Sequence, residues 1–152
     1  IEDIVRMIMD FFHVERDKAA RAQAPPVRWE HVRIGKADLK GAYTLLFYLA
    51  AMAALVALEL EGGLVMILFG GSFGSVIVPF AFQVVSRVLA FELARRLQGR
   101  ALVYIDDICL CTLEQWEEKD LATTTGLCKG LMGDDAVAEH KTESGRDLDM
   151  LG

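Results

Sequence analysis

The chain has few residues of the types that build disulfide-rich or zinc-stapled domains, with three cysteines and three histidines among 152 residues. Cys109, Cys111 and Cys128 are an odd number, and only His140 follows near them, whereas a structural zinc site takes four ligands. Cys109 and Cys111 would share one face of a strand as small buried residues. We therefore expect neither zinc nor disulfides, and a reducing intracellular compartment, cytoplasm or nucleus.

Positive charge is also scarce, because 16 Lys and Arg face 22 Asp and Glu and give a net charge of −6. This balance argues against a self-sufficient nucleic-acid binder, whose affinity comes mostly from basic residues on phosphates. The charge is uneven: residues 1–36 carry seven basic and six acidic residues, and residues 112–152 carry four and ten. Any nucleic-acid affinity must come from local geometry, bound metal or further parts of a longer protein.

Long apolar stretches are few, and one of them, residues 43–58, could be membrane-spanning, although spanning a bilayer takes roughly 20 residues. It has sixteen uncharged residues and ends before Glu59 and Glu61 without a basic cluster. It favours a buried strand end and a helix in a core, although a small membrane-associated helical protein built on residues 43–82 is an alternative. The first residues lack the basic region and apolar core of a signal peptide.

The composition, 53% hydrophobic and 25% charged, is typical of a globular domain with its own core. Apolar spacing and Pro and Gly positions predict helices over 1–24, 79–99 and 114–133. Strands are predicted over 32–39, 63–70, 100–105 and 108–113. This order is typical of an α+β fold with an antiparallel hairpin at its centre.

The stretch ALVYIDDICL, residues 101–110, carries the strongest functional signal. Its two strands would form a hairpin that projects Asp106 and Asp107 at the tip, at a cost in repulsion and desolvation. A divalent cation reverses this cost, because Mg²⁺ takes carboxylate and phosphate oxygens and two such ions can promote phosphoryl transfer. Asp38, at the end of a predicted strand, is the candidate third carboxylate. The alternative is a plain turn, in which Asp is common.

A second acidic pair, Asp134 and Asp135, occurs in the sequence MGDDAV. Its flanks are not a matched pair of apolar strands. We therefore expect these two residues to form a solvated turn rather than a metal site.

The segment YIDD (104–107) resembles motif C of reverse transcriptases, the Tyr-x-Asp-Asp hairpin of the polymerase palm. ADLKGAYTLL (37–46) resembles motif A, and FGSVIVPFAFQ (73–83) resembles motif B. AEHKTESG (138–145) and LDMLG (148–152) resemble motif D and the start of motif E. These motifs follow the family's order, which is far more specific than any one of them, and are closest to LTR-type or DIRS-type retrotransposons.

The resemblance implies a reverse transcriptase palm over 28–152: a small antiparallel sheet with the Asp-Asp hairpin, backed by helices. Residues 1–27 would be a helical segment or partial fingers. The implied activity is RNA-directed DNA synthesis with two Mg²⁺ ions, for which Mn²⁺ can substitute. The implied partners are an RNA or DNA template with its primer, and dNTPs, but no membrane. Because fingers, thumb and RNase H portions are missing, we expect a piece of a longer polyprotein.

The resemblance also assigns roles around the acids. Asp38 and Asp106 would hold both metal ions, with Asp107 as the third acid. The carbonyl of Leu39 would face a metal. Tyr43 would stack under the incoming sugar and reject a 2′-hydroxyl, which argues against a polymerase of RNA; alternatively it is a core residue.

Further matches concern the nucleotide and the strands. Phe73, Gly74 and Gln83 match positions near the incoming nucleotide and template, Tyr104 a position beside the primer terminus, and Lys141 the lysine proposed to protonate the leaving pyrophosphate. Phe73 could instead be a packing residue and Lys141 a solvated one. Gln83 and Arg87, four apart on one helix face, would track template phosphates or only cover the helix surface.

Motif B departs from the family, because Ile77 and Val78 stand where small or polar residues usually precede the proline. They could crowd the nucleotide site. A catalytically inactive remnant of the fold, acting as a binding or structural module, is therefore a second functional hypothesis.

Overall fold

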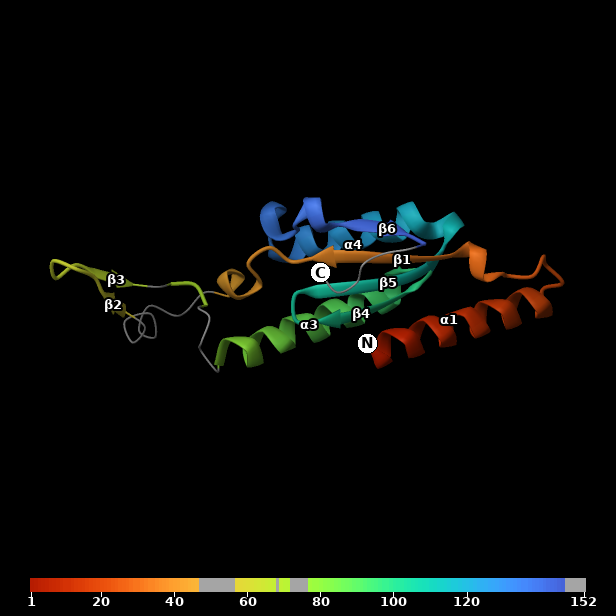
Figure 1. Cartoon of the computed structure of the whole chain (residues 1–152), viewed down its shortest axis with the longest axis horizontal. Coiled ribbons are helices and arrows are strands. Elements are labelled where there is room, and N and C mark those ends of the chain that lie inside the picture. Colours follow the sequence, from red (N-terminus) through yellow and green to blue (C-terminus); the bar gives the residue numbers. More distant parts are fainter. Residues whose placement is uncertain (47–56, 68, 72–76, 147–152) are drawn as a thin grey trace.

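A computed structural model describes residues 1–46, 57–67, 69–71 and 77–146 (Figure 1). Its helices and strands are, in chain order, α1 (Glu2–Arg21), β1 (Val32–Asp38), β2 (Ala57–Glu59), β3 (Val65–Ile67), α3 (Ile77–Arg96), β4 (Arg100–Tyr104), β5 (Asp107–Leu113), α4 (Glu117–Met132) and β6 (Glu143–Gly145). Short 3₁₀ turns are η1 (Trp29–His31), η2 (Ala42–Leu45), η4 (Glu114–Trp116), η5 (Asp134–Ala136) and η6 (Glu139–Lys141).

The centre of the fold is a four-stranded antiparallel sheet in the order β4-β5-β1-β6. Strands β4 and β5 form the predicted hairpin, and β1 pairs with β5 along its whole length, from Val32 opposite Leu113 to Asp38 opposite Asp107. This is the expected α+β, palm-like architecture. The long β1–β5 pairing matters for the site because it fixes which residues of two distant segments stand side by side.

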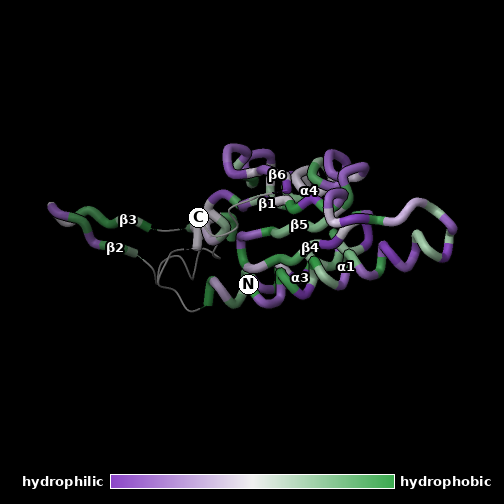
Figure 2. The backbone as a smooth tube through the Cα atoms, turned by 45° about the vertical axis from the view of Figure 1, so that its right-hand side comes forward, coloured by the Kyte–Doolittle hydropathy of each residue, from purple (hydrophilic) through white to green (hydrophobic). Residues whose placement is uncertain are grey.

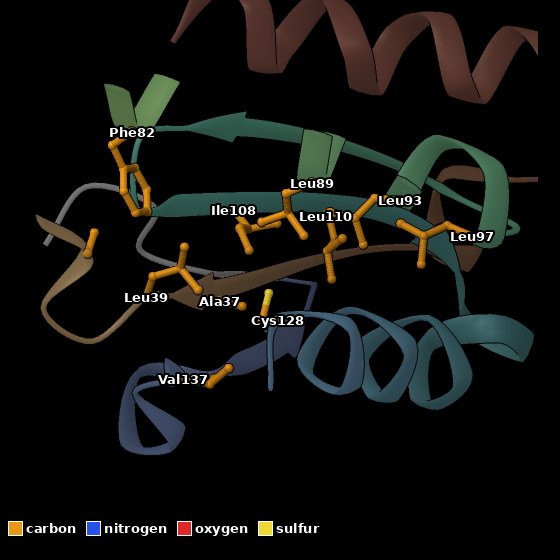
Figure 3. Packing of buried hydrophobic residues seen from close by; sticks show 11 residues of the cluster. Ala37, Leu39, Phe82, Leu89, Leu93, Leu97, Ile108, Leu110, Cys128 and Val137 are labelled. Carbon is orange, nitrogen blue, oxygen red and sulfur yellow. The ribbon is translucent and has the colours of Figure 1, made fainter. Parts of the chain in front are cut away.

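Alternation along β1 and β5 sends residues to two separate cores, because successive strand residues point to opposite faces. On one face, α3 and α4 cover the sheet, and Figure 3 shows the resulting cluster, which includes Ala37, Leu39, Phe82, Leu89, Leu93, Leu97, Ile108, Leu110, Cys128 and Val137. On the other face, α1 packs against β1 and β5. This second cluster contains Met7, Phe11, Phe12, Val32, Cys109, Cys111 and Leu113. The sheet is therefore a middle layer between helices.

The cysteines take the structural role that their spacing predicts. Cys109 and Cys111 are buried on the same face, under α1, and Cys128 is buried under the opposite face. Burial raises the pKa of Cys109 to about 11 and that of Cys111 to about 12. Their thiols therefore stay protonated near neutral pH and pack as small apolar groups.

Asp120 of α4 joins three elements around the start of β4. Its buried carboxylate accepts hydrogen bonds from the backbone N–H groups of Gln98 and Gly99, at 3.0 and 2.8 Å, and from the Thr112 hydroxyl, at 2.6 Å. A carboxylate with three donors offsets much of its desolvation. These three hydrogen bonds fix the turn from α3 into β4, which is the first strand of the acidic hairpin.

The strand predicted over 63–70 is shorter than expected. Among the described residues of this stretch, Val65–Ile67 is strand, and it pairs with β2 in a separate two-stranded hairpin whose residues are exposed. Figures 1 and 2 show this hairpin standing apart from the sheet, with apolar residues along it. The apolar run 43–58 lies mostly outside the described residues. The expected buried strand end and helix therefore fall largely outside the described residues, and the described parts of the run are a 3₁₀ turn and an exposed strand end.

Helix α3 begins at Ile77, two residues before the predicted start at Pro79. Pro79 still lies in the first turn, where its missing N–H costs no helical hydrogen bond. Within the described residues, α3 is the one helix long and apolar enough to cross a membrane by length and composition. Its inner face, including Phe82, Leu89 and Leu93, packs in the core of the sheet.

Candidate functional site

Three site residues form one row across the end of the sheet. In the strand register Tyr104 lies opposite Asp107, and Asp107 lies opposite Asp38. Directly opposed residues point to the same face, with Cβ atoms roughly 4.5–5.5 Å apart. The sequence placed both hairpin acids in the turn, but the turn is Ile105–Asp106 and Asp107 begins β5. Asp106 therefore stands beside the row, where its carbonyl accepts a 3.0 Å hydrogen bond from the Leu39 N–H.

The carboxylates influence one another electrostatically. Partial burial, then the charges of Asp106 and Asp38, raise the pKa of Asp107 above its ordinary value of 3.8. Lys36 and Lys141 act in the opposite direction. Lys36 is two residues before Asp38 in β1 and therefore lies on the same sheet face as the acids. The site thus concentrates negative charge at a cost that two nearby ammonium groups partly offset.

Lys141 contacts the site directly, although it follows Asp38 by about a hundred residues. Its Nζ lies 3.1 Å from Asp38 Oδ2, with the Lys141 side chain 53% exposed and that of Asp38 14% exposed. The turns η5 and η6 place it there. The Ala138 N–H donates to the Asp38 carbonyl at 2.9 Å, and Val137 bridges to Leu39. The lysine singled out by the motif D resemblance is therefore an ion-pair partner of the motif A acid.

The donors suit a hard divalent cation in kind. Asp38, Asp106 and Asp107 offer the carboxylate oxygens that Mg²⁺ prefers, and their mutual repulsion is the situation that such an ion relieves. Within the described ranges, however, no three acidic, cysteine or histidine side chains converge closely enough to hold a metal ion. The Lys141 ammonium instead neutralises Asp38. The residues therefore fit the ion chemically, while one of them, Asp38, is paired with a lysine.

The hairpin turn is held in a strained conformation. Ile105 has a φ of +55°, a left-handed value that costs a non-glycine residue roughly 1–2 kcal/mol and is rare for a β-branched side chain. The buried Ser86 of α3 anchors the turn, because its hydroxyl lies 2.9 Å from the Ile105 carbonyl and 3.0 Å from the Phe82 carbonyl. Sequence reasoning missed Ser86, whose one signal is a hydroxyl on an otherwise apolar helix face.

Tyr43 and Leu39 follow β1 toward α3. Leu39 is buried in the core. Tyr43 is half-buried in η2, and its ring meets the ring of Phe82 edge-on, with centroids 6.2 Å apart. Gly71 lies against the Tyr43 backbone so closely that a Cβ there would stand 2.4 Å from the Tyr43 carbonyl oxygen. Tyr43 is thus packed in place, which is compatible with both the core and the sugar-contact roles.

The predicted strand and nucleotide contacts are only partly described. Gln83 and Tyr104 line one cavity between α3 and the hairpin, and Tyr104 is 75% exposed. Phe73 and Gly74 lie outside the described residues. Of the two unusual motif B residues, Val78 is buried in contact range of Gly71 and Ile77 is 60% exposed. Val78 is therefore a core residue.

Comparisons with known proteins bear on the fold of the chain. No family model matches the chain, and no curated protein matches it in sequence. Among solved structures, it is similar to apo telomerase from Candida Tropicalis truncated from the C-terminal domain, with 13% identity and a TM-score of 0.57. The alignment covers 97% of this chain and 36% of that chain, so this chain spans about a third of it. The chain thus has a polymerase-like palm fold.

Proposed function

We propose that this chain is the palm of an RNA-directed DNA polymerase from a retroelement, in which Asp38, Asp106 and Asp107 form the nucleotidyl-transfer centre. The observation that supports it most is the strand register: it brings Asp38, from one motif, directly opposite Asp107, from another about seventy residues later. Like charges directly opposite each other on paired strands destabilise the sheet, and a purely structural hairpin does not need them. The likeness in fold to a telomerase supports the same class of protein.

Each residue of the proposed centre would have its own role. Asp38 and Asp106 would hold the ions and Asp107 would complete the acidic cluster. Mg²⁺ would supply activation of the primer 3′-hydroxyl and charge stabilisation at the departing pyrophosphate. Tyr43, held by Phe82, would support the sugar of the dNTP. Lys141 would deliver its proton to the pyrophosphate after leaving Asp38, to which it is bonded in this structure.

The test is primer extension on a homopolymer RNA template with Mg²⁺ or Mn²⁺. The wild-type chain is compared with the Asp106→Asn, Asp107→Asn double variant, for which we expect a loss of at least a hundredfold, because charge stabilisation at the reacting centre supplies several kcal/mol. Asp134→Asn, Asp135→Asn is the matched control, since that pair lies exposed in η5 as the sequence predicts.

Two outcomes would count against the proposal. Equal extension by both double variants would place the chemistry elsewhere. An inactive wild type that also fails to bind Mn²⁺, measured by loss of the free-ion paramagnetic resonance signal, would favour the inactive remnant of the same fold. Mn²⁺ binding that is lost only in the Asp106, Asp107 variant would support the metal site independently of turnover.

A further inference from the structure

The four-stranded sheet has two edges, and they differ in length and in charge. The edge strand β6 has three residues and begins with Glu143, whereas the edge strand β4 has five, of which Ala101, Leu102 and Val103 are apolar. A short, charged edge strand resists pairing with a further chain, and a longer apolar one favours it. Among the described residues, no strand pairs with the outer side of β4. Of the two edges, β4 is therefore the one suited to an additional strand.

The hairpin geometry determines which backbone groups β4 leaves free. Its turn has two residues and is closed by the pair of Tyr104 and Asp107, and such a closing pair is hydrogen-bonded through both backbones. Hydrogen-bonded pairs alternate along an antiparallel ladder. The N–H and C=O groups of Ala101 and Val103 therefore point to the free edge. Within the described ranges, these groups have no hydrogen bond outside the sheet.

A hollow lies beside this edge, on the α1 side of the sheet. It has a volume of about 660 Å³, within the range of ligand sites, and is lined by residues of α1, of the C-terminal end of α3 and of β4. Met7, Phe11 and Leu102 give it an apolar base. Because helices flank the edge, an extended segment can reach it. A second copy of the chain would have to bring its own α1 and α3 into the same space.

Two carboxylates without partners stand on the α1 side of the hollow. Asp3 and Asp10 are seven residues apart in one helix and therefore lie on the same side of it. Both residues are exposed, and neither carboxylate has a hydrogen bond or an ion pair in the part of the chain that the structure describes. They are therefore available to a cationic ligand.

Most other charges of the hollow are already paired. Arg6 bonds to Glu2 at 3.0 Å, and Lys18 bonds to Glu15 at 2.6 Å. Arg100, at the start of β4, is the opposing charge that remains. The unpaired charge of the hollow is thus negative in balance, as is the net charge of −6 of the whole chain. This balance favours a basic partner.

We propose that the β4 edge binds an extended basic peptide segment as an added antiparallel strand. Its backbone bonds to the N–H and C=O groups of Ala101 and Val103, as in other cases of strand addition. Every second side chain enters the hollow, where lysine stems cover the apolar base and their ammonium groups reach Asp3 and Asp10. This partner surface goes beyond the proposed function and does not depend on it.

The experiment measures peptide binding to the full chain in EDTA, without primer or nucleotide. The probe is the fluorescein-labelled peptide Lys-Val-Lys-Val-Lys-Val, followed by anisotropy. Asp3→Asn, Asp10→Asn should weaken its affinity about fivefold, because two exposed ion pairs are lost. Asp134→Asn, Asp135→Asn removes the same charge outside the hollow and should change affinity less than twofold. Circular dichroism should show that both double variants are folded, since they alter exposed side chains.

Methylation of the peptide backbone tests the added strand itself. When the lysines face α1, the valines lie opposite Ala101 and Val103 and direct their N–H groups at β4. N-methyl groups on the valines should therefore lower affinity at least about tenfold. N-methyl groups on the lysines, whose N–H groups point away from β4, should change it by no more than about twofold.

Several results would overturn the assignment. Equal affinity of the two methylated peptides would leave only unspecific attraction to an acidic protein, and so would equal effects of the two aspartate double variants. A chain that sediments as a dimer and does not bind the probe would have a second copy on the edge instead. Because no step uses Mg²⁺, primer or dNTP, these outcomes are independent of the primer-extension test.

Discussion

At the scale of single residues, the site concentrates charge that the folded chain would be more stable without. Asp107 faces Asp38 across the strands, with Asp106 beside it, and these charges add to burial in raising its pKa. Active sites commonly hold such groups at a cost in stability. Lys141 reduces the cost by pairing with Asp38, a contact between segments that no sequence spacing reveals.

Asp107→Asn should therefore stabilise the metal-free protein, and the gain should depend on pH. Because the pKa of Asp107 is higher in the folded chain than in the unfolded one, protonation of Asp107 favours the folded state. This contribution to the free energy of unfolding is complete below about pH 4 and is lost as pH rises through the folded pKa. Urea unfolding in EDTA should give the variant a free energy of unfolding that is higher than that of the wild type by about 0.2–1 kcal/mol at pH 7, and by less near pH 4.

Asp134→Asn is the control for this pH series, because Asp134 is exposed in η5 and takes no part in the strand register that opposes Asp107 and Asp38. It should show no comparable gain at pH 7. A gain for Asp107→Asn that is the same at pH 4 and pH 7 would mean that charge repulsion is not its cause.

At the scale of elements, the sequence predicts what local patterns determine. Helix α1 and strand β1 fall within a few residues of their predicted bounds, and β4 and β5 form the predicted hairpin. The central place of β1 and the edge place of β6 depend on pairing between distant segments, which spacing does not encode. In the described part of the stretch 63–70, the strand is limited to Val65–Ile67, which pairs with β2 and whose side chains are exposed rather than packed in a core.

The hairpin turn shows the same limit for the candidate site. The YIDD motif predicts the acids, yet Ile105, a β-branched residue that disfavours a positive φ, gives no sign of the left-handed turn it adopts. That conformation persists because Ser86 of α3 bonds the Ile105 carbonyl. Two residues 19 apart in sequence thus set the geometry of the acids together.

Ser86→Ala should loosen the hairpin more than the helix. The single hydroxyl hydrogen of Ser86 is shared between two carbonyls, and its loss leaves the Ile105 carbonyl without this donor, at a cost of about 1–3 kcal/mol. We expect a melting temperature lower by roughly 2–4 °C per kcal/mol for a domain of this size. Hydrogen exchange should become faster in residues 103–108.

Thr123→Ala is the matched control for this prediction. The Thr123 hydroxyl bonds the Lys119 carbonyl four residues earlier in its own helix and is exposed, so it ties no second element. Its loss should leave exchange at the hairpin unchanged. If Ser86→Ala also leaves the hairpin unchanged, the left-handed turn is held by packing instead.

At the scale of the whole molecule, α3 is apolar on both sides. Its inner residues Phe82 and Leu89 are fully buried, whereas Phe80 and Val84 on the opposite side are 72% and 58% exposed. Figure 2 shows apolar colour along α3 and along the β2–β3 hairpin. The exposed residues of α3 recur at helical spacing, so they form one stripe: Ile77, Phe80, Val84, Val88 and Phe91. A stripe of this kind promotes association in water.

The double variant Phe80→Gln, Val84→Lys should therefore increase the soluble yield of the chain and its monomer fraction in size-exclusion chromatography. Stability should change by less than about 1 kcal/mol, because neither side chain is packed in the core. Leu89→Gln, on the buried face of the same helix, should instead unfold the protein. An unchanged elution profile in buffer would show that the stripe does not drive association. The palm requires a mixed α/β circular dichroism spectrum. If the wild type and the variant both stay in solution only with detergent and show high helix content, the membrane-associated alternative is favoured instead.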